Sequence, residues 1–144
     1  MRHEVTVEIE APVERVWQVL VEVQRWPEWT ASMENLTLSG AGPLHEGATV
    51  VIKQPRVAEM IWQVTDFRPL RGFTWETSGP GFKTVARHEI EGRGRATTAR
   101  LVIEQTGLVA MLIGPFIKGM TKRYVAMEAA GLKQRSEAMP DPAN

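Results

Sequence analysis

The chain begins with a strict alternation of apolar and polar side chains. Val5, Val7 and Ile9 fall on one side of an extended segment, and glutamate and threonine side chains fall on the other. This period of two predicts a strand with one buried and one solvated face. Between Val13 and Leu20 the apolar spacing changes to three or four residues, which predicts an amphipathic helix.

Prolines mark both ends of this helix. Pro12 suits its first turn, and Pro27 disfavours a helical conformation at the residue before it, so we expect the helix to end near Gln24. The sequence RWPEW, with Trp26 and Trp29 on either side of the proline, predicts a second short helix or turn.

Six short runs rich in β-branched and aromatic residues follow. They are MENLTLSG, ATVVIKQ, AEMIWQVTDF, GFTWETS, TVARHEIEG and TTARLVIEQT. The sequences GAGP, RPLRG, SGPGF and GRGR lie between them and are typical of turns. Because no helical segment interrupts the six runs, we expect an antiparallel meander.

Helical spacing returns from Leu108 to about Glu137 and predicts a long amphipathic helix. Gly114-Pro115 either precedes its regular part or kinks it, since proline removes a helical hydrogen bond. We expect residues 138–144 to form a disordered tail. The predicted buried face of the helix is made of Leu112, Phe116, Met120, Tyr124 and Met127.

The order of elements predicts a single α+β domain over residues 1–137. Its sheet has about seven antiparallel strands and one solvated face, so the other face must be covered. The last helix is the only element long enough to cover it. We therefore expect a curved sheet wrapped around this helix, with the two early helices closing one end.

This order, and the residues that carry it, resemble the START-like (SRPBCC, helix-grip) superfamily. The matching sequences are VEIEAPVERVWQVL, WPEW, VTDFRPLRGFTWE and GLKQRSE, and together they cover nearly the whole chain. The similarity is greatest to the bacterial polyketide cyclase/dehydrase and lipid-transport branch. EGRGRATTA stands where this branch usually has a short glycine turn, which allows a longer loop and leaves the register of Arg95 to Ala99 open.

The resemblance implies a deep cavity between the long helix and the concave face of the sheet. In relatives this cavity takes up a hydrophobic molecule such as a lipid, sterol, polyketide or quinone. The superfamily also includes cyclases and regulators of a chaperone, so the resemblance indicates the fold more sharply than the function.

Composition narrows the classes of function. The 144 residues include 17 basic and 17 acidic side chains, so the net charge gives no support to nucleic-acid binding. There is no cysteine, which excludes disulfides and thiolate chemistry and agrees with a cytoplasmic location. His3, His45 and His88 lack a ligand spacing, and no phosphate loop or serine-nucleophile motif occurs, so we predict neither a metal nor a cofactor.

His88 is the exception in an otherwise regular strand. In TVARHEIEG the charged side chains of Arg87, Glu89 and Glu91 share one side, so His88 lies on the side that must be buried. If that side is a cavity wall, the imidazole is placed to orient a ligand or to act as a general base.

Strand alternation and the helical face together predict a largely apolar and aromatic binding site. Trp62 and Trp75 are equally consistent with an ordinary core, and Tyr124 with packing at the rim. The predicted ligand-binding residues are Trp29, Met60, Trp62, Phe73, Trp75, Thr77, His88, Leu101, Leu112, Phe116, Met120 and Tyr124.

Three functions are consistent with these features. The first is binding of a small hydrophobic molecule by a monomer or weak homodimer that acts as a carrier or sensor. The second is a cyclase or dehydratase with His88 as base, and the third is a protein-interaction module. A cavity of ~300 Å³ or more would favour binding, and a filled core would favour the interaction module.

The apolar run from Gly107 to Ile117 adds a further hypothesis. It is too short to cross a bilayer, which takes ~20 residues, so we expect no stable membrane insertion. As part of an amphipathic helix it is able to touch a membrane surface, or to form a mobile start of the helix that gates ligand entry.

Overall fold

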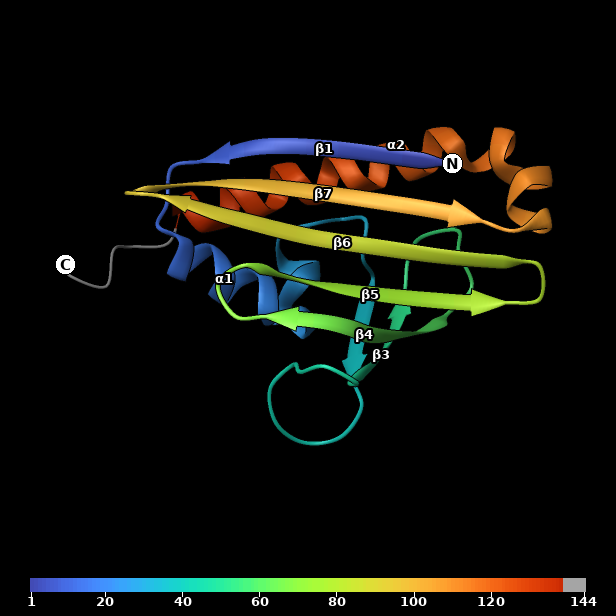
Figure 1. Cartoon of the computed structure of the whole chain (residues 1–144), viewed down its shortest axis with the longest axis horizontal. Coiled ribbons are helices and arrows are strands. Elements are labelled where there is room, and N and C mark those ends of the chain that lie inside the picture. Colours follow the sequence, from blue (N-terminus) through green and yellow to red (C-terminus); the bar gives the residue numbers. More distant parts are fainter. Residues whose placement is uncertain (139–144) are drawn as a thin grey trace.

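The computed structural model describes residues 1–138, and its elements follow the predicted order. Strand β1 (Arg2–Ile9) leads into helix α1 (Val13–Val21) and the 3-10 helix η1 (Val23–Glu28), and the chain ends in helix α2 (Leu108–Ala138) (Figure 1). Between η1 and α2 lie β2 (Asn35–Leu38), β3 (Thr49–Lys53), β4 (Met60–Arg68), β5 (Gly72–Gly79), β6 (Phe82–Arg93) and β7 (Ala96–Thr106).

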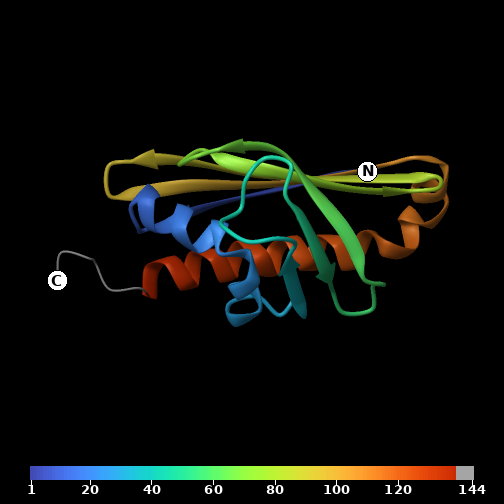
Figure 2. The same ribbon diagram turned by 90° about the horizontal axis from the view of Figure 1, so that it is seen from below.

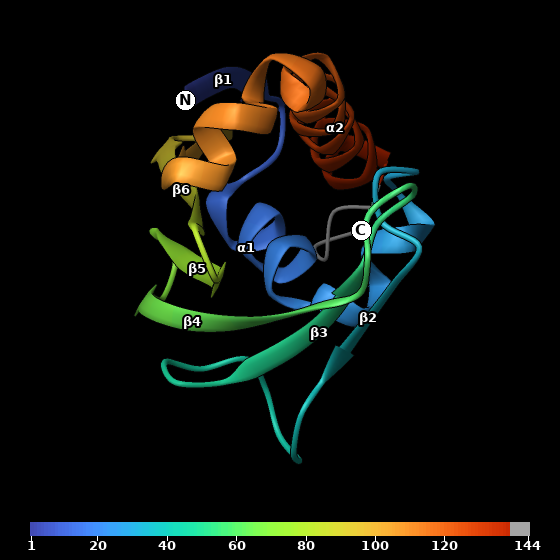
Figure 3. The same ribbon diagram turned by 90° about the vertical axis from the view of Figure 1, so that its right-hand side faces the viewer.

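The seven strands form one antiparallel sheet in the order β1-β7-β6-β5-β4-β3-β2. Helix α2 runs along one side of this sheet, and α1 and η1 lie at one end (Figure 2). Viewed along the long axis, the sheet curves through β5 and β4 to β2, and α2 lies across its open side (Figure 3). The α+β prediction, with a curved sheet around the last helix, is therefore confirmed.

The structure corrects or completes three local predictions. Helix α1 ends at Val21, not near Gln24, because Glu22 adopts φ −80° and ψ 65°, outside the helical region. The predicted second short helix is η1, which contains Pro27. At the β6–β7 hairpin, pairing continues to Arg93 and Ala96, so the connection is a tight turn and not a longer loop.

Helix α2 is kinked, and all of its buried residues lie in its second part. The helix begins at Leu108, so Pro115 lies inside it, and the turns before this proline run in a different direction from the rest (Figures 1 and 3). The predicted tail, residues 138–144, lies outside the described residues except for Ala138, which ends α2. The buried residues of α2 are mostly small and are Thr121, Val125, Ala129, Gly131, Leu132 and Ser136.

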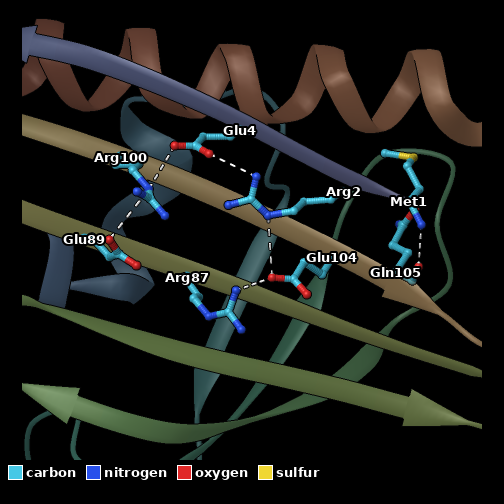
Figure 4. A network of polar contacts seen from close by, with 8 residues as sticks. All are labelled: Met1, Arg2, Glu4, Arg87, Glu89, Arg100, Glu104 and Gln105. Carbon is cyan, nitrogen blue, oxygen red and sulfur yellow. Dashed lines mark hydrogen bonds and ion pairs between the residues drawn. The ribbon is translucent and has the colours of Figure 1, made fainter.

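The outer face of the sheet carries a network of ion pairs across β1, β7 and β6 (Figure 4). Arg100 Nε lies 2.9 Å from Glu4 Oε1, and Arg2 bridges Glu4 and Glu104. Opposite charges on neighbouring strands favour this register, although each exposed pair adds little stability. Arg87 also hydrogen-bonds Glu104 and holds the pKa of that carboxyl below its ordinary range.

At Gly131, helix α2 comes close to the segment that follows η1, and a substitution there tests this contact. A Cβ at this position would lie 2.1 Å from the backbone oxygen of Trp29, whereas a Cβ at Gly119 would meet nothing within 4 Å. We expect Gly131→Ala to lower the free energy of unfolding by about 1–3 kcal/mol through overpacking. Gly119→Ala, the matched control, should be neutral or stabilising by up to about 1 kcal/mol. Urea denaturation measures both, and equal effects would contradict the proposed contact.

Glu104 predicts a pH dependence of stability. Because its pKa is lower in the folded than in the unfolded protein, its charge stabilises the fold above about pH 4.3, the ordinary glutamate pKa. This contribution is lost as the pH falls through the lower, folded-state pKa. Glu104→Gln should therefore cost at most about 1 kcal/mol at neutral pH, since solvent screens the pair, and progressively less in acid.

Denaturation curves of the wild type and Glu104→Gln at several pH values measure this difference. The control is Glu91→Gln, on β6 at the same solvated face of the sheet, and it should leave the pH dependence of stability unchanged. A stability difference for Glu104→Gln that is constant with pH would contradict the assignment.

Candidate functional site

A cavity of about 430 Å³ lies between the concave face of the sheet and helix α2. Its walls come from β3 to β7, the β3–β4 loop and α2. Its volume is within the range of small-molecule sites and exceeds the ~300 Å³ that distinguishes a binding site from a filled core. Most of its lining is apolar, including Met33, Ile52, Val57, Met60, Trp62, Trp75, Phe82, Ala86, Leu101, Ile103, Ile113, Ile117, Met120 and Val125.

The cavity extends from a buried inner end to an exposed outer end. His88, Trp75 and Leu101 are buried and line the inner end. Arg56 and Ile113 also line it but are exposed, so the cavity reaches the surface between the β3–β4 loop and the first turns of α2.

A hydrogen bond links the two sides of the cavity near its outer end. The Tyr124 hydroxyl, on α2, donates to the backbone oxygen of Pro55 in the β3–β4 loop at 2.5 Å. The loop and the helix are therefore tied together beside the opening, and the opening itself is bounded by the loop and the helix turns that precede Tyr124.

Aromatic rings fix the orientation of His88. Its ring stacks on Phe73, with centroids 4.4 Å apart and an interplanar angle of 25°. Trp26 and Trp75 meet it edge to face, with centroid distances of 5.4 and 5.3 Å. The His88 side chain is 3% exposed, so its polar atoms depend on protein partners.

Two hydrogen-bond partners satisfy the imidazole. Nδ1 lies 3.2 Å from the backbone oxygen of Phe73, and Nε2 lies 3.1 Å from Oε1 of Glu128. A carbonyl oxygen only accepts, so Nδ1 must carry a proton. The contact between Nε2 and Glu128 then shares one further proton, and the pair is either imidazolium with carboxylate or neutral imidazole with carboxylic acid.

Glu128 is the functional residue that sequence reasoning missed. It lies on α2, lines the cavity and has a side chain 12% exposed, so the His88–Glu128 pair is within reach of a bound molecule. A signal was present in the sequence. Glu128 follows Tyr124 by one helical turn and is the only acidic residue between Leu108 and Ser136.

The structure brings together eight of the predicted binding residues. They are Met60, Trp62, Trp75, Thr77, His88, Leu101, Met120 and Tyr124, and all line the cavity.

The other four predicted residues do not line the cavity. Phe73 is buried behind His88, and Trp29 packs against Trp26. Leu112 and Phe116 point to solvent and are 75% and 85% exposed.

The error on Leu112 and Phe116 has a geometric cause. The predicted face used steps of four residues, and each such step turns about 40° beyond a full turn of a 3.6-residue helix. Over the three steps from Leu112 to Tyr124 the drift is about 120°, a third of the circumference. The residues of α2 that line the cavity include one step of three residues, from Ile117 to Met120, which corrects this drift. Among them are Val109, Ile113, Ile117, Met120 and Tyr124.

Hydroxyl and indole groups in the cavity differ in their availability. The Thr77 hydroxyl donates to the backbone oxygen of Ile61 at 2.8 Å, so its proton is not free to assist His88. Trp26 donates its indole N–H to the backbone oxygen of Leu20. Trp62 and Trp75 line the cavity itself.

Two classes of feature are absent from residues 1–138. No group of three histidine, aspartate or glutamate side chains is placed to hold a metal ion. Within the same range, no helix combines the length and apolar character needed to cross a membrane.

Comparison with known proteins identifies one family and many solved structures that are similar to this chain. Residues 1–137 match the family described as "Polyketide cyclase / dehydrase and lipid transport". No curated protein matches the sequence.

Solved structures share the fold at low sequence identity. The Zhui aromatase/cyclase from Streptomyces sp. R1128 superimposes with a TM-score of 0.80 at 16% identity, covering 100% of this chain and 98% of its own. A START superfamily protein from Mycobacterium smegmatis gives 0.71 at 15%, covering 93% and 97%. Norcoclaurine synthase from Thalictrum flavum gives 0.73 at 12%, covering 94% and 93%. These superpositions confirm the predicted helix-grip fold.

Proposed function

The chain belongs to the polyketide cyclase/dehydrase and lipid-transport family, and from this premise we propose that it binds a small hydrophobic molecule in its internal cavity, as a carrier or sensor. The observation that carries the proposal is the cavity of about 430 Å³, apolar along most of its walls. A chain that needed only a stable core would fill this volume, because interiors are close-packed.

The lining indicates what kind of molecule fits. An apolar body matches the aliphatic walls, and the two tryptophans, Trp62 and Trp75, favour a planar or aromatic portion because aromatic rings pair with one another. At the inner end the His88–Glu128 pair offers a shared proton, so it suits a hydroxyl or carbonyl group on the ligand. A lipid, polyketide or aromatic compound with one such polar group meets both requirements.

The open cavity does not favour the protein-interaction alternative. That hypothesis expected a filled core, and the space between the sheet and α2 is not filled.

Blocking the cavity tests the binding proposal. Ala86 lines the cavity, whereas its neighbour Val85 lies on the opposite face of β6. We expect Ala86→Phe to weaken binding of the neutral fluorescent probe N-phenyl-1-naphthylamine by about tenfold or more, because the new ring takes the ligand's volume. Val85→Phe, the matched control, should bind the probe as the wild type does.

Fluorescence titration gives both dissociation constants, and native mass spectrometry of the purified protein shows whether a ligand is carried from cells. Equal probe binding by both variants, or no binding by the wild type, would reject the cavity as the site.

The His88–Glu128 contact favours a second candidate, a cyclase or dehydratase. A histidine paired with a carboxylate in an apolar cavity is able to take a proton from a β-keto chain and return it to an oxygen of the same molecule. Thr77 and Tyr124, the two hydroxyl groups that line the cavity with the pair, already donate to backbone oxygens. The pair would therefore have to supply the proton transfer by itself.

Glu128→Gln and His88→Ala separate catalysis from binding. If the pair is catalytic, either variant should lower kcat on a linear poly-β-ketone thioester by about 10²–10⁴-fold and change the affinity for the fluorescent probe little. Glu128→Gln keeps the shape of the side chain but cannot take up a proton. A proportional fall of turnover and probe affinity would mean that the pair only binds.

A further inference from the structure

The first turns of α2 expose a continuous apolar surface. Only three other large apolar side chains among the described residues are exposed, namely Met1, Ile61 and Leu70. A contiguous patch of this kind on an otherwise polar surface marks an interaction site. Its members, which we call the apolar patch, are Leu108, Val109, Met111, Leu112, Ile113 and Phe116.

Cations without partners border the apolar patch. Lys118, Lys122 and Arg123 are exposed, and no ion pair involves them within the part of the chain that the structure describes. Between Leu108 and Met127 the helix has no acidic residue. On the outer face of the sheet, by contrast, Arg2, Arg87 and Arg100 are all paired with glutamates.

We propose that the segment from Leu108 to Arg123 docks on the surface of an anionic lipid bilayer. Apolar side chains beside unpaired lysine and arginine residues are the combination that binds a helix in the interfacial region of a membrane. Anionic headgroups would supply the missing counter-charges. A second copy of the chain fits less well, because a two-fold contact would bring the cations of both copies to one interface, and the helix has no acidic residue between Leu108 and Met127 to meet them.

The mechanics of α2 suit this role. The buried residues of the helix begin at Thr121, so the core holds only the end of this segment, while its start is attached at the β5–β6 turn, where the Val109 N–H donates to the backbone oxygen of Gly81 at 2.8 Å. Pro115 interrupts the helical hydrogen bonds within the segment, and nothing lies within 4 Å of a Cβ built at Gly114 or Gly119. Between these attachments Met111, Leu112 and Phe116 already face solvent, so they are able to meet lipid while the second part of α2 stays in place.

The docking segment also adjoins the opening of the cavity. Val109 and Ile113 belong to the apolar patch and line the cavity as well, and Ile117 continues that lining toward Met120. Docking would thus place the outer end of the cavity at the bilayer, where a hydrophobic ligand is concentrated. This consequence rests on the proposed binding function, but docking itself does not require an occupied cavity.

Vesicle flotation with the full chain tests the proposal. We expect the wild type to bind vesicles of phosphatidylcholine with about one third phosphatidylglycerol, and to bind pure phosphatidylcholine much less. Leu112→Ser/Phe116→Ser and Lys118→Glu/Lys122→Glu should each lower the partition coefficient by about tenfold or more. Raising the salt concentration should weaken binding of the wild type by screening its cations.

A charge-matched variant controls for net charge. Arg93 and Arg95 are exposed at the β6–β7 turn, at the opposite end of the sheet from the start of α2 (Figure 1). Arg93→Glu/Arg95→Glu makes the same change in net charge as the lysine variant and should leave vesicle binding within about twofold of the wild type.

Three results would overturn the proposal. They are no binding of the wild type to anionic vesicles, an equal loss in the arginine control, or a dimer in sedimentation equilibrium that Leu112→Ser/Phe116→Ser dissociates. Binding of N-phenyl-1-naphthylamine by the same variants separates the two proposals. If the wild type binds the probe but not the vesicles, docking is rejected and ligand binding stands. If Ala86→Phe loses probe binding but still binds vesicles, the docking proposal and the ligand-binding proposal are both supported.

Discussion

One hydrogen bond, between His88 on β6 and Glu128 on α2, joins the two walls of the cavity at its inner end. The imidazole is buried and its Nδ1–H donates to the backbone oxygen of Phe73, so the partner of Nε2 has to come from the helix. Leaving either group unpaired in this apolar setting would cost the free energy of desolvation without compensation. The rotation of α2 about its axis is therefore constrained, because Glu128 must face His88. Tyr124, one turn earlier, then faces the cavity and reaches the β3–β4 loop.

The two parts of helix α2 differ in burial and in role. Small buried residues after Thr121 let the helix backbone approach the rest of the fold closely, as the contact of Gly131 with Trp29 shows. The turns before Pro115 contain no buried residue; they are attached through the Val109 N–H to the backbone oxygen of Gly81 and expose apolar side chains. One helix thus closes the inner part of the cavity firmly and bounds its opening with a segment that is free to meet another apolar surface.

The strand faces could be predicted because the side-chain period of a strand is two, and the period does not drift. His88, Trp62 and Trp75 were assigned to the inner face on this basis, and all three line the cavity. The helix was harder, because its period is 3.6 and small errors accumulate along it. Leu112 and Phe116 were placed inside for this reason, although Tyr124, near the middle of the helix, was placed correctly.

By itself, the sequence determined the order of the elements, the inner face of each strand and the presence of one titratable side chain on that face. These depend on local spacing and on the cost of burying charge, and both are visible in the chain. Only the tertiary structure decided that Glu128 meets His88, that the space before them stays open, and that the apolar start of α2 faces outward. Each of these depends on how a helix is positioned against strands some 40 residues away in sequence, as His88 and Glu128 are. No local pattern specifies that distance or rotation.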